Sequence, residues 1–272
     1  AAQDAMPKDS SIRHEFHIAP GSLKGQSSPF GAKMPVITVN DLTFSYSRKA
    51  ANVFNNFSWT VNKGECVGVL GHNGAGKTTL LKLLYGVLKP SRGGVRINVR
   101  DIASYREIFL LSDKFGLDRQ ASLHENLEFR KRLFKIDGFD DRKNYWMNRL
   151  NFIEHASKRI FALSAGLEMR AQLVAGLCLE PRLILLDEPT NSIDPATREA
   201  VISLLNEMQA EGRTCLFVTH DLEFARRVAS RVVTLQNGDI VDDDLVRGPV
   251  SLEEFTGRYL HMTEGTGSQD PS

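Results

Sequence analysis

Eight consecutive residues form a pattern that binds phosphate groups. Gly71 to Thr78 read Gly-His-Asn-Gly-Ala-Gly-Lys-Thr, which satisfies every fixed position of G-x-x-x-x-G-K-[ST]. Glycines let the backbone curl so that successive N–H groups point at an anion, and a helix beginning at the end of the loop adds its positive end. In such a loop Lys77 reaches the β- and γ-phosphates, and the Thr78 hydroxyl takes one position on Mg²⁺. The predicted phosphate-binding residues are Gly71, Asn73, Gly74, Ala75, Gly76, Lys77, Thr78 and Thr79.

Two carboxylates follow an apolar run much further along the chain. The run Leu183 to Leu186 is typical of a central strand and leads directly into Asp187 and Glu188. Open α/β sheets bind ligands at the C-terminal ends of their strands. Asp187 is therefore predicted to hold the Mg²⁺ shell, directly or through water, and Glu188 to orient or deprotonate an attacking water. An acidic pair after a strand often only caps the next turn, but the phosphate loop favours the catalytic interpretation.

The elements that must position these residues alternate in type. The phosphate loop follows a short apolar run, Cys66 to Leu70, that predicts a strand, and Lys77 to Tyr85 has helical spacing with Gly86 as a stop. The other predicted elements are strands at 36–39, 57–61, 183–186 and 215–218, helices at about 165–179 and 195–210, and a hairpin around 236–239. This alternation predicts an α/β fold in which helices cover a largely parallel sheet.

Composition limits the function classes. The chain has 272 residues, a formal net charge of +1 and a charged fraction of 25%, so its bulk charge indicates neither a nucleic acid nor an anionic membrane surface as partner. No window approaches the roughly 18 to 20 consecutive apolar residues of a membrane-spanning helix. The three cysteines, Cys66, Cys178 and Cys215, form no Cys-x-x-Cys pair and stand in apolar surroundings, which predicts buried reduced thiols.

The two ends of the chain differ from its middle. Residues 1–33 are rich in Ser, Pro, Gly, Lys and His and have no periodic apolar pattern, which predicts a flexible arm or an expression remnant. Residues 249–272 are predicted to form a poorly structured C-terminal tail. The organised body is expected to cover about residues 34–248.

In this order, the motifs resemble those of the ABC ATPase family. Leu163 to Arg170, which read Leu-Ser-Ala-Gly-Leu-Glu-Met-Arg, are similar to the family's signature motif. Asn191 to Pro195 resemble its D-loop, and Phe217 to Asp221 resemble the strand that carries its switch histidine. The resemblance covers about residues 36–241. It implies a P-loop NTPase of ABC type, with a mixed or parallel sheet core, an antiparallel N-terminal β-subdomain and a helical subdomain at about 114–165.

The resemblance also implies a mechanism in which two such subunits, most simply a homodimer, enclose two ATP molecules head to tail. Ser164 and Gly166, at the start of a helix, would bind the γ-phosphate held by the opposite subunit's loop. His220 would contact the γ-phosphate and help to hold the attacking water. Asp194 of the D-loop belongs to the same nucleotide-binding set.

An aromatic residue upstream of the phosphate loop has two interpretations. Tyr46 stands where the family places an aromatic side chain that stacks on adenine. Aromatic residues near strand ends are often part of the core, and Phe44 lies close by in the sequence, so a purely structural role for Tyr46 stays open.

The chain departs from the family pattern at two places. Where the family usually has Ser-Gly-Gly-Gln, this chain has Ala165 and Leu167 in the second and fourth positions. The continuation Leu-Glu-Met-Arg resembles exporters of the polysaccharide and drug type more than nutrient importers.

The second departure is Asp113, which stands at the position of the family's Mg²⁺-contacting glutamine and whose oxygens suit a hard cation. Asp113 is therefore predicted as a metal ligand beside Thr78 and Asp187, the alternative being a solvated side chain without a role.

The function that the resemblance implies is ATP hydrolysis, with ATP and Mg²⁺ as cofactors, coupled to transport and specifically to export. Separate transmembrane permease subunits are expected to dock near residues 113–130, where Phe115, Leu117 and Phe129 are candidates for an apolar groove. The protein is expected at the cytoplasmic face of the inner membrane, as a peripheral subunit without direct nucleic-acid contacts. Two alternatives remain: a non-transport ABC ATPase acting on nucleic acid or the ribosome, which the absence of a basic tract disfavours, and a regulatory subunit with weak hydrolysis.

Overall fold

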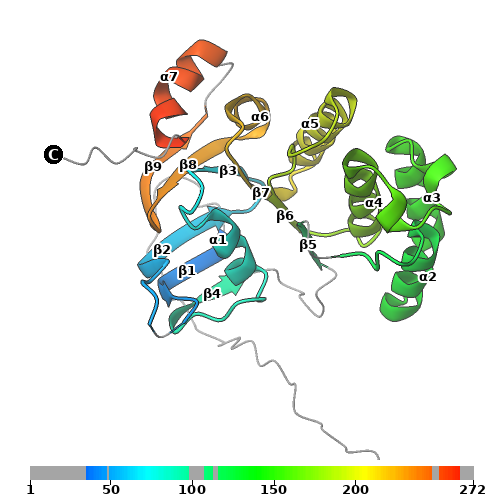
Figure 1. The fold of residues 1–272 in the computed structure, drawn as a ribbon, viewed down its shortest axis with the longest axis horizontal. Coiled ribbons are helices and arrows are strands. Elements are labelled where there is room, and N and C mark those ends of the chain that lie inside the picture. The colour runs from blue at the N-terminus through cyan, green and yellow to red at the C-terminus, as the bar shows by residue number, and fades with distance from the viewer. Residues whose placement is uncertain (1–34, 48, 98–106, 113–115, 247–250, 264–272) are drawn as a thin grey trace, which may run out of the picture. The chain divides into compact units, whose positions relative to one another are not determined.

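The computed structural model describes residues 35–47, 49–97, 107–112, 116–246 and 251–263, and side chains up to residue 260 (Figure 1). The predictions for the arm at 1–33, for Asp113 and for Phe115 lie outside these ranges. All described residues belong to one unit, residues 33–272.

An antiparallel sheet forms the N-terminal part of this unit. Its strands are β1 (Pro35–Phe44), β2 (Phe54–Asn62) and β4 (Arg92–Ile97), in the order β2-β1-β4. In β2 buried and exposed side chains alternate, as expected for a strand with one face on the core. The sheet confirms the antiparallel N-terminal β-subdomain. β1 and β2 are longer than predicted, because register shifts in β1 break the simple alternation of the sequence.

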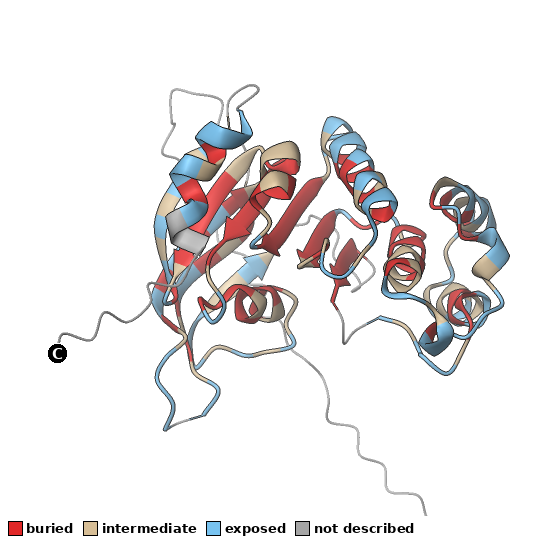
Figure 2. Ribbon diagram, turned by 45° about the horizontal axis from the view of Figure 1, so that its top comes forward, coloured by how far each residue is buried: buried red, intermediate tan, exposed pale blue. Residues whose placement is uncertain are grey.

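A second, six-stranded sheet carries the chemistry-bearing loops. Its order is β5-β6-β7-β3-β8-β9, formed by β5 (Ile108–Leu111), β6 (Leu183–Asp187), β7 (Thr214–Thr219), β3 (Cys66–Leu70), β8 (Arg231–Gln236) and β9 (Asp239–Leu245). The pairs from β5 to β8 are parallel, and the last pair is an antiparallel hairpin around residues 236–239, as predicted. The parallel strands are buried almost throughout, which explains their unbroken apolar runs (Figure 2).

Two apolar clusters, one on each side of this sheet, hold the unit together. One joins the antiparallel sheet and α1 (Lys77–Leu84) to the six-stranded sheet. The other packs α5 (Pro195–Ala210), α6 (Leu222–Val228) and the helices after β5 against the opposite side. The three cysteines are free and buried, as predicted, and Cys66 and Cys215 are register partners on β3 and β7. Their contact and burial raise the pKa of the Cys66 thiol.

Short helices form a separate group beyond β5 in Figure 1. They are α2 (Leu123–Phe134), α3 (Phe139–Arg149), η2 (Ile153–His155), η3 (Ile160–Ala162) and α4 (Ala165–Leu177). α2 begins with a capping box, in which Ser122 accepts from the Glu125 amide and the Glu125 carboxylate accepts from the Ser122 amide. Leu123 and Trp146 are buried in the apolar cluster that also contains residues of α5 and α6. All of these helices except α4 fall within the helical subdomain predicted at about 114–165, and α4 corresponds to the helix predicted at about 165–179.

The segment predicted as a poorly structured tail contains a helix, so that prediction is wrong for α7 (Leu252–Thr263). Phe255 and Tyr259, one turn apart, are buried, and α7 contacts α6 and β8. Arg258 pairs with Asp242 and Asp244 of β9. This short amphipathic pattern is difficult to recognise in the sequence, because the last residues of the chain are mostly polar.

Among the residues that the structure describes, no helix, α7 included, has the length and apolar character needed to cross a membrane.

Candidate nucleotide-binding site

The phosphate loop connects the end of β3 to the start of α1. Gly76 has φ 106°, and a Cβ atom there would lie 3.0 Å from Cζ of Phe54. A Cβ at Gly71 would lie 2.4 Å from the carbonyl oxygen of Leu235. Glycine is therefore required at both ends of the loop, because the backbone conformation and the close packing leave no room for a side chain.

The first turn of α1 fits an anion. Its N-cap is Gly76, so no side chain accepts a hydrogen bond from the first amides of the helix, and the first turn contains no acidic residue. Amides at a helix start need an acceptor from elsewhere, and phosphate oxygens suit that role. A Cβ at Gly74 would meet no atom within 4 Å, so the loop is open there. The Ala75 amide donates to the carbonyl oxygen of His72 at 3.2 Å and is already used within the loop.

Lys77 places a buried cation at the centre of this loop. Its ammonium group donates to the carbonyl oxygens of Gly71 at 2.7 Å and His72 at 3.2 Å, and the side chain is only 7% exposed. Burial lowers the pKa of Lys77, although the carboxylates of Glu188 and Asp187 act in the opposite direction. Phosphate oxygens would be stronger partners for this ammonium than the two neutral carbonyls.

The two predicted metal ligands that the structure describes come together. The Thr78 hydroxyl donates to Oδ1 of Asp187 at 2.9 Å, although 109 residues separate them in the chain. A hydroxyl and a carboxylate are oxygen ligands of the kind that Mg²⁺ prefers, and Mg²⁺ usually binds through few protein ligands plus substrate phosphates and water. The described part of the chain has no group of three or more His, Cys, Asp or Glu side chains able to hold a metal. The pair fits a shared Mg²⁺–nucleotide site.

Glu188 lies between Lys77 and His220. Its Oε1 is 3.8 Å from Nζ of Lys77, and its Oε2 is 3.1 Å from Nδ1 of His220. Glu188 has φ 48°, in the left-handed region, and its amide donates to the carbonyl oxygen of Val218 on β7 at 3.0 Å. The bend takes the side chain out of line with β6, which ends at Asp187, so that it faces the phosphate loop and β7. Strained backbone of this kind often occurs at functional sites.

Tyr46 follows β1 and contacts the start of α1. Its hydroxyl lies 2.8 Å from the Thr79 hydroxyl, its ring meets Phe44 edge-on with centroids 5.1 Å apart, and the residue is 60% exposed. A core aromatic would be covered, so the exposure disfavours the purely structural interpretation. The open ring next to the phosphate loop is available for stacking on a base. The contact with Thr79 is not visible in the sequence pattern.

The signature residues lie elsewhere in the subunit. Ser164 caps α4 by accepting from the Leu167 amide at 3.4 Å, and α4 packs against α2, α3 and β5, whereas α1 packs against β4, β6 and β7. A Cβ at Gly166 would lie 2.7 Å from Oδ2 of Asp194, the N-cap of α5. Of the two residues that depart from the family's signature motif, Ala165 is exposed and Leu167 packs against the apolar core. The structure thus joins the signature motif to the D-loop of the same chain.

Two residues without a predicted role take part in that junction. Arg170 of α4 hydrogen bonds to Thr197 of α5, which in turn donates to Asp194. The sequence offers one hint, because Arg170 stands inside the signature-like segment, but it offers none for Thr197. Of the predicted docking residues, Phe129 is 66% exposed and Leu117 is partly buried against the core.

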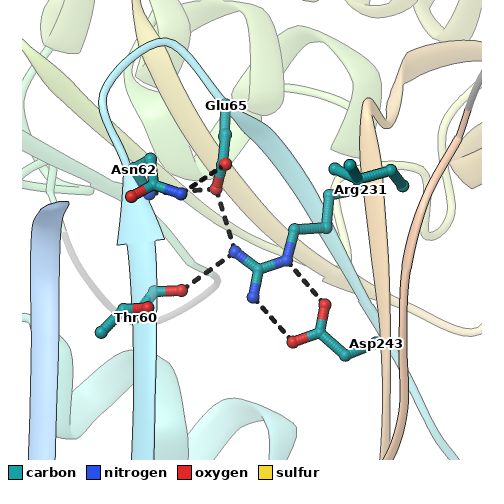
Figure 3. Close-up of a pocket in the computed structure, with 6 residues that line it drawn as sticks. Thr60, Asn62, Glu65, Arg231 and Asp243 are labelled. Carbon is teal, nitrogen blue, oxygen red and sulfur yellow. Dashed lines mark hydrogen bonds and ion pairs between the residues drawn. The ribbon is translucent and has the colours of Figure 1, made fainter. Parts of the chain in front are cut away.

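A shallow pocket of about 450 Å³ lies away from all predicted site residues and contains a structural ion-pair network (Figure 3). The Arg231 guanidinium lies between two carboxylates: it donates to both oxygens of Asp243 at 2.6 and 2.7 Å, and to Glu65 at 3.0 Å. It also donates to the carbonyl oxygen of Thr60 at 3.0 Å. Since Thr60 belongs to β2 and Arg231 to β8, the network connects the two sheets. Its donors are taken by protein groups, which indicates a structural role.

The chain is similar to known proteins over most of its length. The family described as ABC transporter matches residues 54–191. An ABC transporter ATP-binding protein of Methanocaldococcus jannaschii is 32% identical over 236 residues, which cover 85% of this chain and 87% of the relative. The Nod factor export ATP-binding protein I of Rhizobium leguminosarum bv. viciae is 33% identical, covering 78% and 70%. The methionine import ATP-binding protein MetN 1 of Listeria monocytogenes is 29% identical, covering 81% and 67%.

Solved structures agree with this similarity. An ATP-binding subunit of an ABC transporter superposes with a TM-score of 0.73 at 27% identity, covering 84% of this chain and all of the other. The ATP-binding cassette MJ0796, solved as a dimer in a post-hydrolysis state bound to ADP and Pi, has a TM-score of 0.69 at 25% identity, covering 78% and 99%. These similarities confirm the predicted fold class.

Proposed function

Because the chain belongs to the ABC transporter family of ATP-binding proteins, whose cofactors are ATP and Mg²⁺, we propose that it hydrolyses ATP at the site around Lys77 and Glu188 to drive transport. The observation that carries this proposal is the position of the Glu188 carboxylate, between the Lys77 ammonium and the His220 imidazole. A subunit that only bound ATP would not need a carboxylate held at this place by a bent backbone.

Each residue of the site has a chemical role in this proposal. Lys77 and the first amides of α1 bind the β- and γ-phosphates and offset their charge. Thr78 and Asp187 hold Mg²⁺, which when bound supplies charge stabilisation at the phosphate oxygens. Glu188 accepts a proton from the attacking water or orients that water, and His220 fixes the position of the Glu188 carboxylate and contacts the γ-phosphate. Tyr46 stacks on the adenine ring.

A second subunit completes the site. In one chain, Ser164 is the N-cap of α4 and Gly166 lies in the first turn of this helix. Figure 1 shows α4 beyond β5, away from α1. Their helix start, with an exposed hydroxyl and a glycine backbone, suits the γ-phosphate of a nucleotide held by another copy. We assign the chain to a homodimer in which each ATP lies between the phosphate loop of one copy and the signature motif of the other. The dimeric structure of a similar cassette supports this assignment.

The transport direction and partners belong to the same proposal. Relatives of comparable identity carry the names of both import and export proteins, so their names favour neither direction. The Leu167 to Arg170 continuation of the signature motif favours export. Separate transmembrane subunits would bind near residues 113–130, where Phe129 is exposed, and would hold the protein at the cytoplasmic face of the inner membrane.

The Glu188→Gln variant tests the catalytic assignment. Glutamine keeps the shape of the side chain but cannot accept the proton of the attacking water, so we expect turnover to fall by roughly 10²- to 10⁴-fold with ATP binding retained. Glu154→Gln, at an exposed carboxylate of η2, is the matched control and should keep full turnover. Undiminished hydrolysis in Glu188→Gln would show that another group is the base.

Affinity purification from gently solubilised native membranes tests the transport assignment. A polytopic membrane protein recovered in stoichiometric amount would support it and indicate the class of cargo. Recovery of ribosomes, nucleic acid or only water-soluble partners would leave the ATPase assignment intact and overturn the transport assignment.

A further inference from the structure

The hydroxyl group of Thr197 is the centre of a buried contact between α4 and α5. Thr197 is 1% exposed, and its Oγ1 accepts hydrogen bonds from Arg170, from Nε at 3.0 Å and from Nη2 at 2.6 Å. The same hydroxyl donates to Oδ2 of Asp194 at 2.6 Å. One donor and two acceptor positions are all that a hydroxyl has, so Thr197 is fully used.

This contact does more than cap a helix. As N-cap of α5, Asp194 needs only the bond from the Thr197 amide to its Oδ1, which is present at 2.9 Å. The second carboxylate oxygen is held by the Thr197 hydroxyl, and that hydroxyl is polarised by a guanidinium from another helix. The Thr197 hydroxyl, the Thr197 amide and the more distant charge of Arg170 lower the pKa of Asp194. Thr197 therefore holds both carboxylate oxygens of Asp194, one through its amide and one through its hydroxyl.

The carboxylate so fixed touches the signature motif. A Cβ atom at Gly166 would lie 2.7 Å from Oδ2 of Asp194 and 3.3 Å from Oγ1 of Thr197. The backbone of Gly166 therefore packs directly on the Asp194–Thr197 pair. Asp194 itself is exposed, but Thr197 beside it is buried, so sliding of α4 along α5 would disturb this packing.

We propose that Arg170 and Thr197 are positioning residues that hold the signature segment Ser164–Gly166 and the D-loop residue Asp194 as one rigid unit. The inference rests on the proposed head-to-tail dimer, in which both segments face the second copy. Holding them together means that a second copy meets a preformed surface, and no part of the binding free energy is used to order that surface. The hydrogen bonds of Arg170 and Thr197 connect these residues to each other and to Asp194, so they act on ATP-driven pairing of subunits, through Gly166 and Asp194.

The test compares two measurements on the full-length Glu188→Gln protein, in which ATP stays intact. The first is the affinity of the subunit for ATP at low protein concentration. The second is the ATP concentration that gives half-maximal dimer in analytical ultracentrifugation. Thr197→Val keeps the shape of the side chain and removes the hydroxyl, and Thr197→Ser keeps the hydroxyl.

We expect Thr197→Val to raise the ATP concentration for half-maximal dimer by about tenfold, the scale of one charge-assisted hydrogen bond, with ATP affinity unchanged within about twofold. Thr197→Ser should dimerise like the parent. Arg170→Met, which leaves the buried hydroxyl in place, should reproduce the Thr197→Val effect and serves if Thr197→Val does not fold.

Arg149→Met is the matched control. Arg149 also joins the helical region to α5, because its Nη2 donates to Ser203 at 3.3 Å and to Glu207 at 2.5 Å, but at residues remote from the D-loop. If Arg149→Met impaired dimerisation as much as Arg170→Met, the effect would be general stability and the inference would be overturned. Normal dimerisation of folded Thr197→Val and Arg170→Met, or equal defects in Thr197→Val and Thr197→Ser, would also overturn it. Failure of the Glu188→Gln parent itself to dimerise with ATP would instead count against the proposed function.

Discussion

The Glu188 carboxylate lies 3.1 Å from Nδ1 of His220, and the His220 amide also points at the same Oε2 atom, at 3.4 Å. The two residues come from the ends of neighbouring parallel strands, β6 and β7. Of these two residues, only Glu188 has its backbone in the left-handed region, with φ 48°. His220 directly follows Thr219, the last residue of β7. The imidazole is thus placed by the sheet, and the carboxylate is turned toward it.

Replacing His220 with glutamine should lower the turnover number more than the affinity for ATP. The imidazole fixes the Glu188 carboxylate and is 55% exposed toward solvent, so its loss affects the reacting water more than the bound phosphates. We expect kcat to fall by roughly 10²-fold or more and the Kd for ATP to change little. His124→Gln, on the exposed side of α2, should behave like the parent in steady-state ATPase assays. A rise in Kd that accounts for the whole loss would contradict the assignment.

Replacing Tyr46 with alanine should weaken nucleotide binding. Stacking of a base on an aromatic ring contributes about 1–3 kcal/mol, so we expect the Kd for ATP to rise by roughly 5- to 150-fold. Tyr46→Phe keeps the ring but loses the Thr79 contact and should lie between alanine and the parent. Tyr145→Ala removes another exposed tyrosine, on α3, and should leave the Kd unchanged in calorimetric titrations. Equal affinities for the Tyr46→Ala protein and the parent would return Tyr46 to a structural role.

Stability should fall in acid through the network around Arg231. Burial raises the pKa of Glu65, but hydrogen bonds from Asn62 and Arg231 outweigh it, so the folded-state pKa lies below the ordinary value of 4.5. A depressed carboxyl pKa contributes stability that is complete above the unfolded-state pKa and is lost as the pH falls toward the folded-state value. Urea unfolding of the parent between pH 7 and 3 should show this loss beginning below about pH 4.5.

The Glu65→Gln variant isolates that contribution. It should be less stable than the parent at pH 7, and its free energy of unfolding should depend less on pH in the acid range. Glu154→Gln, which removes an exposed carboxylate of η2, provides the comparison. If the free energy of unfolding fell equally steeply with decreasing pH in the parent and in Glu65→Gln, the Glu65–Arg231 pair would not be a source of the pH dependence.

Two helical glycines should respond in opposite directions to alanine. A Cβ at Gly176 of α4 would lie 2.3 Å from the ring of Phe109, whereas a Cβ at Gly257 of α7 would meet nothing within 4 Å. Gly176→Ala should destabilise by about 1–3 kcal/mol through overpacking. Gly257→Ala should be neutral or stabilise by up to about 1 kcal/mol, because alanine is the better helix former. Thermal unfolding of both variants checks the signs, and a stable Gly176→Ala protein would show that Phe109 can move aside.

Local chemistry explains what could be predicted from the sequence. Cys66–Leu70 and Pro195–Ala210 occur with the predicted bounds, since the first precedes a glycine-rich loop and the second begins with Asp-Pro, a strong helix start. β4 was not predicted, because Gly93 and Gly94 interrupt any strand pattern. β4 forms through pairing with β1, which is tertiary information.

In the candidate site, too, some features could be predicted from local sequence and others depend on tertiary packing. The phosphate loop, Asp187, Glu188 and His220 stand at strand ends, where spacing and order carry the prediction. The contacts of Thr79 with Tyr46 and of Thr197 with Arg170 join residues 33 and 27 positions apart, respectively, through hydroxyl groups that have many alternative partners. Such contacts depend on how α1, α4 and α5 pack, and no periodicity in the sequence specifies that.

The helix α7 has a practical consequence for anyone who shortens this protein. A chain cut at Gly248, where the polar composition begins, would lose Phe255 and Tyr259 and leave uncovered the apolar surface of α6 and β8 on which they pack. Exposed apolar surface of this kind promotes self-association, so such a fragment would precipitate or form aggregates during purification even with an intact phosphate loop. Affinity tags and fluorescent fusions therefore belong after Thr263, where α7 ends, with the helix retained.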